Sequence, residues 1–144
     1  MKNSTRWFGW IVVITALHMS EQLVFGIGEL AIIKRILAVY YGWFQQPDYA
    51  TVVLVTIIAT LVNALMFGLL MGGKWRGISL GFMGFLGLGE VHHVIEAIHA
   101  RGYNPGLITA IPFMVFGGLL LAAVVRERHE EVANAASQAV VAKV

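Results

Sequence analysis

Four long apolar segments dominate this chain and restrict what it can fold into. They cover about residues 8–33, 51–71, 77–99 and 107–125. A helix needs about 20 mostly apolar residues to cross the hydrocarbon of a bilayer, and a helix satisfies its own backbone hydrogen bonds there. We therefore predict an all-α, polytopic membrane protein, in which a bundle of four transmembrane helices occupies residues 1–126.

The composition supports a membrane protein and argues against several other classes. Of the 144 residues, 58% are hydrophobic and 12% are charged, which is too apolar for an ordinary soluble domain of this size. The formal net charge is +2, but the basic residues are scattered at the ends of the apolar segments, which argues against nucleic-acid binding. Because the chain has no cysteine, disulfides, thiolate metal sites and iron–sulfur clusters are excluded.

The segments outside the predicted spans indicate how the chain sits in the bilayer. Residues 36–44 are aromatic and too short to cross, so they are expected to lie in the interface. Residues 127–144 are charged and then alanine-rich, which predicts a short soluble tail. The positive-inside rule predicts both termini in the cytoplasm, as in an integral protein of a bacterial inner membrane. The basic residues then on the inner side are Lys2, Arg6, Lys74, Arg76, Arg126, Arg128 and Lys143.

Two groups of histidine and glutamate interrupt the predicted spans. The first group is His18, Glu21 and Glu29, and the second is Glu90, His92, His93, Glu96 and His99. Ionisable side chains are costly in hydrocarbon and normally face the bundle interior or a wet cavity. Positions three, four, seven and eleven apart share one face of a helix, so each group forms a stripe on its helix.

The spacing of these groups predicts a metal site. Glu-x-x-His pairs on bundle helices build di-iron and di-manganese sites, and histidine with carboxylate suits zinc, iron or manganese. The predicted ligands are His18, Glu21, Glu90, His92, His93 and Glu96. Of these, Glu21, His93 and Glu96 are the candidate catalytic groups. Gln22, Glu29, Asn63 and His99 are expected to support the ligands from further out.

Helix geometry predicts that the two groups meet. At 1.5 Å per residue, and with antiparallel spans, Glu21 and Glu90 both lie roughly 20 Å from the inner face. The first and third spans are therefore expected to face each other. Asn63 of the second span falls near the height of His18, which places it beside the same site.

Three pieces of the chain together resemble the HXXEE-domain family of small bacterial integral membrane proteins. They are His18-Met19-Ser20-Glu21-Gln22, His92-His93-Val94-Ile95-Glu96-Ala97 and Tyr103-Asn104-Pro105-Gly106-Leu107-Ile108-Thr109-Ala110. The resemblance covers about residues 10–120 and implies a membrane protein for which an enzymatic role is proposed from the motif. His18 and Glu21 match the first and fourth motif positions. Gln22 stands where the family has glutamate, and glutamine is a poorer metal ligand and no general base.

Three functions stay open from the sequence. The first is a membrane-embedded metalloenzyme that acts on a small or lipid-soluble substrate. The second is a metal-free acid–base site, and the third is a non-catalytic subunit of a membrane complex or a homo-oligomer. Haem bound between His18 and His93 is disfavoured, because glutamates three residues away crowd the porphyrin and there is no Cys-x-x-Cys-His motif. Glycines 77, 81 and 84 are expected to let another helix approach closely.

Overall fold

Helices and the short connections between them make up the part of the chain that the structure describes. The computed structural model describes residues 2–25, 35, 38–40, 42–43 and 47–142, and the all-α class expected from the sequence is confirmed there. Glu29 and much of the expected interfacial segment fall outside these residues. The helices are α1 (Asn3–Phe25), α3 (Pro47–Met71), α4 (Gly73–Gly89), α5 (Val91–Ala100) and α6 (Leu107–Val141).

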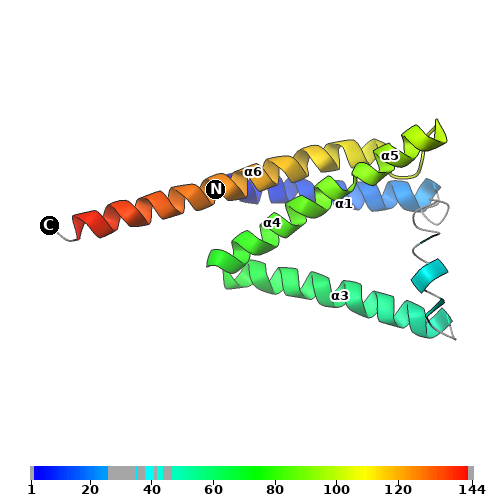
Figure 1. Ribbon diagram of the computed structural model, residues 1–144, viewed down its shortest axis with the longest axis horizontal. Helices are drawn as coiled ribbons and strands as arrows, with labels where there is room; N and C mark the ends of the chain where they lie inside the picture. The colour runs from blue at the N-terminus through cyan, green and yellow to red at the C-terminus, as the bar shows by residue number, and fades with distance from the viewer. Residues whose placement is uncertain (1, 26–34, 36–37, 41, 44–46, 143–144) are drawn as a thin grey trace.

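Helices α1, α4 and α6 pack together, and helix α3 diverges from them. Helices α1 and α6 lie side by side in opposite directions, and α4 packs along α6 (Figure 1). Helix α5 continues α4 toward the end of the pair at which α6 begins. Helix α3 packs chiefly on α4, next to the turn that joins them, and diverges from the other helices beyond it. The expected tail after residue 127 is a direct continuation of α6.

Two helical stretches have the length and composition of membrane spans. Among the described residues these are Gly73–Ala100, which comprises α4 and α5, and Leu107–Val140 of α6. Only 28% of the most apolar 18-residue segment of each stretch is buried inside the chain. Most of their apolar surface therefore faces outward, which suits a lipid environment and is unlike the core helix of a soluble protein. The structure does not confirm the four spans expected from the sequence.

Helices α4 and α6 approach each other closely through glycines. A Cβ atom added at Gly117 would lie 2.7 Å from the carbonyl oxygen of Gly84 and 3.1 Å from the Cα atom of Gly87. Close contact through small residues is a common way for helices to associate in membranes. The expectation for Gly84 is confirmed, whereas Gly77 and Gly81 have open space around their Cβ positions, so they make no such contact with the described residues.

A carboxylate from α6 caps the start of α1. Glu127 accepts a hydrogen bond from the backbone N–H of Ser4 at 2.8 Å and another from the Ser4 hydroxyl at 2.7 Å. The first N–H groups of a helix lack partners within it, and a negative charge there also interacts favourably with the helix dipole. Arg76 of α4 joins the cluster by donating to the Thr5 hydroxyl at 2.7 Å. The start of α1 is therefore tied to both α6 and α4.

Alanine at Gly117 is expected to destabilise the packing of α4 on α6. The added methyl group meets backbone atoms, which cannot move aside as a side chain can, so we expect a loss of about 1–3 kcal/mol in stability. The measurement is thermal unfolding of the purified protein in detergent. Gly81→Ala is the matched control, because its methyl group enters open space. Equal melting temperatures for the two variants would contradict the glycine contact.

Candidate metal centre

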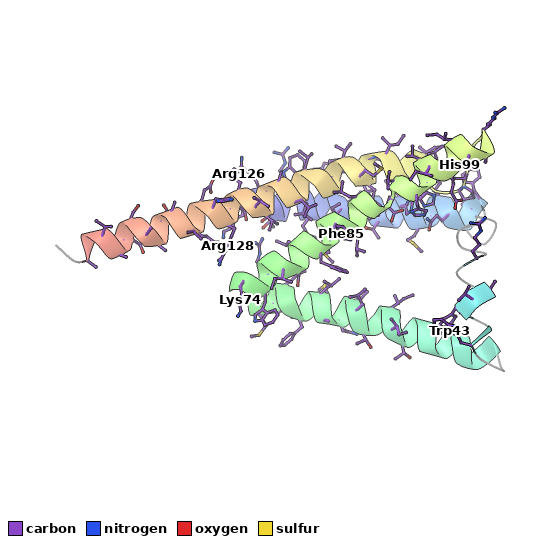
Figure 2. All side chains as sticks on the ribbon, in the orientation of Figure 1. Trp43, Lys74, Phe85, His99, Arg126 and Arg128 are labelled. Atoms are coloured by element: carbon purple, nitrogen blue, oxygen red, sulfur yellow. The ribbon has the colours of Figure 1, made fainter. Side chains whose placement is uncertain are left out.

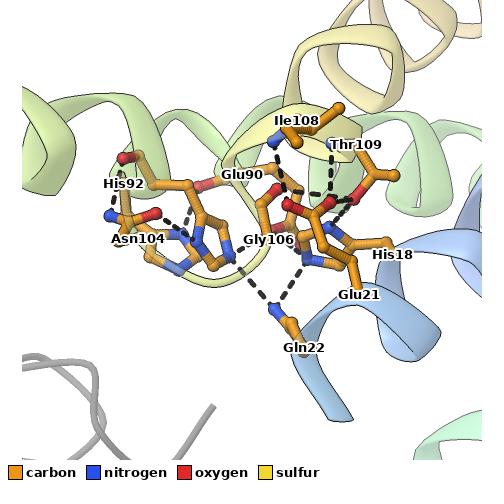
Figure 3. A network of polar contacts seen from close by, with 11 residues as sticks. His18, Glu21, Gln22, Glu90, His92, Asn104, Gly106, Ile108 and Thr109 are labelled. Carbon is orange, nitrogen blue, oxygen red and sulfur yellow. Dashed lines mark hydrogen bonds and ion pairs between the residues drawn. The ribbon is translucent and has the colours of Figure 1, made fainter. Parts of the chain in front are cut away.

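The polar side chains of the first and third segments meet at one end of the helix bundle. His18, Glu21 and Gln22 come from the last two turns of α1, and His93 comes from the first turn of α5 (Figure 3). Glu90 lies between α4 and α5, where Glu90 N–H donates to Gly87 and His93 N–H donates to Glu90, each across three residues. Such a tight turn inside a helical stretch often marks a functional position. The turn directs Glu90 and His93 toward the same point.

Three ligand atoms surround that point. His18 Nε2 lies 3.1 Å from Glu90 Oε2, and His93 Nε2 lies 3.3 Å from the same oxygen. Both histidines are buried, and Glu90 is largely covered. Of the His, Asp and Glu side chains that the structure describes, these three form the one group whose ligand atoms all lie within 4.8 Å of one another.

The hydrogen bonds of Asn104 determine which nitrogen of His93 carries the proton. Asn104 Nδ2 donates to the carbonyl oxygen of His93 at 2.8 Å, so the amide oxygen is the atom that faces the ring. That oxygen accepts only, and it lies 3.3 Å from His93 Nδ1. His93 Nδ1 therefore carries a proton, and in the neutral form of the ring Nε2 is the unprotonated nitrogen.

A chain of hydrogen bonds gives the same result for His18. Glu21 accepts from the Ile108 and Thr109 backbone N–H groups and from the Tyr103 and Thr109 hydroxyls, as a fully ionised carboxylate does. The single hydroxyl hydrogen of Thr109 points to Glu21. Thr109 Oγ1 must then accept from His18 Nδ1, which lies 2.8 Å away. In the neutral form of His18, the unprotonated nitrogen is therefore also Nε2, which faces Glu90.

The central point is therefore surrounded by three hydrogen-bond acceptors, and the neighbouring side chains donate to only two of them. The Gln22 side-chain N–H₂ group donates to His18 Nε2 at 2.7 Å and to His93 Nε2 at 3.1 Å. Both of its hydrogens are used in this way, and Glu90 Oε2 is left buried without a hydrogen-bond donor. A buried unpaired acceptor is costly. A cation placed among the three atoms would satisfy all of them, as would a proton on one imidazole.

The other predicted site residues lie around this centre rather than in it. Glu21 is next to the site, but its carboxylate is occupied at the start of α6 and supports His18 through Thr109. His92 donates from Nδ1 to the Gly89 carbonyl at 3.0 Å, beside the ring of His93. Glu96 is half-buried on α5 outside the three-residue group. His99 and Asn63 are exposed, and their predicted supporting roles stay predictions.

The sequence analysis used the loop before α6 only for the family resemblance and gave its residues no role at the site. Asn104 and Thr109 orient the two imidazoles, and Tyr103 donates to Glu21 at 2.6 Å. Burial and this hydrogen bond raise the pKa of the Tyr103 phenol to about 12, so it stays a donor. Gly106, with φ +97°, passes under both rings, and a Cβ there would lie 2.6 Å from a His93 carbon. The polar pattern of the loop was visible in the sequence, but no spacing rule linked it to the histidines.

Glutamine at position 21 is expected to loosen the start of α6. The amide can accept with one oxygen only, and it brings an N–H₂ group toward the Ile108 and Thr109 N–H donors. We therefore expect Glu21→Gln to cost about 1–3 kcal/mol and to speed hydrogen exchange at these two amides. Hydrogen exchange followed by mass spectrometry of the peptides that cover residues 103–112 measures this. Glu130→Gln, an exposed position on α6, is the control, and identical exchange in both variants would contradict the cap.

One comparison with known proteins gives a match. Residues 10–121 match a family described as "Protein of unknown function with HXXEE motif". Comparison with curated proteins and with solved structures gave no match. The matched range includes the centre and the loop before α6, and it covers most of the 144 residues. The chain therefore belongs to the HXXEE family.

Proposed function

We propose that the chain binds one divalent transition-metal ion through His18, Glu90 and His93. The observation that carries this proposal is the set of three acceptor atoms around one point, with Glu90 Oε2 buried and without a donor. Imidazole binds a metal through its unprotonated ring nitrogen, and in both neutral histidines that nitrogen is Nε2, because Nδ1 donates to Thr109 or Asn104. The Gln22 amide, which donates to both Nε2 atoms, would turn away when a metal binds. A metal ion would remove the repulsion among the lone pairs and the cost of burying the unpaired oxygen.

The spacing of the three atoms supports a transition metal. Ligand atoms that are 2.0–2.1 Å from a tetrahedral zinc lie about 3.3–3.4 Å from one another. The distances from Glu90 Oε2 to the two imidazole nitrogens, 3.1 and 3.3 Å, are close to that value. Two histidines and one carboxylate bind zinc in hydrolases and iron(II) in oxygenases. Zinc and iron(II) therefore rank above manganese, which prefers more oxygen ligands.

The surroundings of the ligands suit a reactive centre rather than a purely structural one. Structural zinc sites have four protein ligands, whereas catalytic sites have three and an open position. A metal held in this way supplies Lewis acidity and lowers the pKa of bound water. Thr109 and Asn104 fix the orientation of the two rings, as carboxylates and carbonyls do behind other metal-binding histidines. We propose a small or lipid-soluble substrate, because the centre lies among outward-facing apolar helices.

A metal-free acid–base site is the second candidate. In that case one imidazole carries a proton on Nε2 and donates it to Glu90 Oε2 at 3.1 or 3.3 Å. A role as a subunit of a membrane complex is the third, and it is supported by large apolar side chains of α3 and α4 that neighbouring helices leave uncovered. These include Phe67, Leu70 and Phe85. Metal content separates the first candidate from the second.

The chain is further proposed to cross a bacterial inner membrane four times, with both termini in the cytoplasm. The support comes from two long apolar helices and from the excess of Lys and Arg on one side of the predicted spans. In this orientation the centre lies toward the outer side of the membrane, and the ends of α1 and α6 that carry Ser4 and Glu127 lie at the inner side.

Replacing any one of the three ligands is expected to remove the metal. Protein expressed with added zinc, iron and manganese should contain about one ion per chain, and removing one of three protein ligands should lower the affinity by at least 10–100-fold. The three variants are His18→Ala, Glu90→Ala and His93→Ala. Elemental analysis of each variant, purified in detergent, measures its metal content. Retained metal in these variants would contradict the assignment of the ligands.

Gln138→Ala and Glu130→Ala are the controls for this series, because both side chains are exposed on α6 and lie outside the centre. Each should keep the metal content of the original chain. The elution volume of every variant shows whether it is folded. If the original chain contains no metal after expression with added zinc, iron and manganese, the metal proposal is wrong and the acid–base site takes its place.

Glutamate at position 22 is expected to make the stability of the chain depend more strongly on metal. It restores the family motif and puts a second carboxylate beside His18 and His93, in place of the amide that now donates to both. Without metal, two carboxylates share one buried space and repel each other. With metal, the added anion is a better ligand than an amide. The rise in melting temperature on adding zinc should therefore be larger for Gln22→Glu than for the original chain, and Gln138→Glu on the exposed tail should behave as the original.

A further inference from the structure

A cavity lies at the opposite end of the bundle from the proposed metal centre. It has a volume of about 360 Å³ and lies between the start of α4 and the part of α6 that follows its apolar stretch. A site for a small molecule typically measures about 300–1,000 Å³. Lys74 and Arg128 lie at this end and His99 at the other (Figure 2). The polar lining residues are Lys2, Lys74, Arg76, Arg128, Glu127 and Glu131.

The carboxylates in this lining are already engaged. Glu127 accepts from the Ser4 backbone and hydroxyl and caps α1. Glu131 pairs with Lys2 at 2.8 Å and lies 3.7 Å from Arg128. Four basic side chains against two acidic ones leave the cavity with an excess of two positive charges.

Lys74 contributes a cation that no carboxylate neutralises. Its Nζ lies 5.4 Å from the centre of the Trp75 ring, and among the described side chains no Asp or Glu oxygen lies within ion-pair distance of it. The cavity also has an apolar wall, formed by Ile78, Leu80 and Val124. An occupant with both an anionic group and an apolar part would satisfy the two kinds of wall.

A neighbouring hollow shows that this charge is particular to the cavity. That hollow shares Lys2, Glu127 and Glu131 with the cavity and adds Arg126 and Glu130. Its two cations face three carboxylates, so it offers no attraction to an anion. Of these two hollows, only the cavity between α6 and the start of α4 therefore has an excess of positive charge.

We propose that this cavity binds the phosphate group of an anionic ligand at the inner boundary of the membrane. The apolar stretch that comprises α4 and α5 begins at Gly73, which itself lines the cavity. Basic pockets between spanning helices on the cytoplasmic side are typical sites for anionic lipid headgroups. The phosphate is supplied either by such a headgroup or by a soluble phosphate ester, and the two sources share the same recognition chemistry.

The test titrates the full chain, purified in detergent, with three probes and counts bound molecules by native mass spectrometry. The probes are phosphatidylglycerol, phosphatidylcholine with the same acyl chains, and inorganic phosphate. We expect phosphatidylglycerol to bind more tightly than phosphatidylcholine and inorganic phosphate to compete with it. The double variant Lys74→Gln with Arg128→Gln removes the cation that has no carboxylate partner and one that shares Glu131 with Lys2. It should weaken binding about fivefold per charge, or about 25-fold in total.

Two matched variants separate a specific site from general charge. Lys74→Arg keeps the charge and should keep the affinity. Arg101→Gln with Arg126→Gln removes the same number of charges outside the cavity and should leave binding unchanged. Thermal unfolding in detergent shows that each variant is folded, independently of the metal centre.

The possible outcomes assign the source or overturn the proposal. Tighter binding of phosphatidylglycerol that depends on Lys74 and Arg128 identifies a lipid headgroup. Binding of inorganic phosphate with the same dependence, and no preference between the two lipids, identifies a soluble phosphate ester. Binding that is equal in the original chain and in the doubly neutralised variant, for every probe, would overturn the proposal.

Discussion

The hydrogen bonds of the Glu21 carboxylate are the interaction on which the candidate metal centre depends. It accepts four hydrogen bonds at the start of α6, two from backbone N–H groups and two from hydroxyls. One of these hydroxyls, that of Thr109, orients His18, so the same carboxylate fixes a helix end and the direction of an imidazole. A charge buried against a helix N-terminus interacts favourably with the helix dipole. The centre is therefore built by pairing α1 with α6, while the turn between α4 and α5 adds Glu90 and α5 adds His93.

The two ends of the α1–α6 pair follow the same principle. Glu21 of α1 caps α6, and Glu127 of α6 caps α1. Each helix thus supplies the carboxylate that its antiparallel neighbour needs at its first turn. One cap lies next to the metal centre and the other next to the basic cavity. The same kind of contact therefore positions both candidate sites, although they lie at opposite ends of the bundle.

Periodicity and burial cost made the class of the fold and part of the site predictable from the sequence. A stripe of His and Glu on an apolar helix has few alternatives to facing the interior, and His18, Glu90 and His93 do meet. Spacing alone could not separate these three from Glu96 and His92. That distinction depends on the tight turn at Glu90 and on the loop before α6, which are tertiary features. The divergence of α3 was equally unpredictable, because a uniformly apolar helix carries no marker of its neighbours.

The two caps also act as a molecular ruler. Ser4 and Glu21 are 17 residues apart on α1, and Thr109 and Glu127 are 18 residues apart on α6, which corresponds to about 26 Å of helix. The hydrocarbon of a bilayer is about 30 Å thick. Because sliding one helix along the other would break both caps at once, the pair has a fixed apolar length. If the α1–α6 pair crosses a bilayer as proposed, a thicker or thinner bilayer would change the tilt of the pair rather than its length, and the depth of the candidate metal centre would change with that tilt.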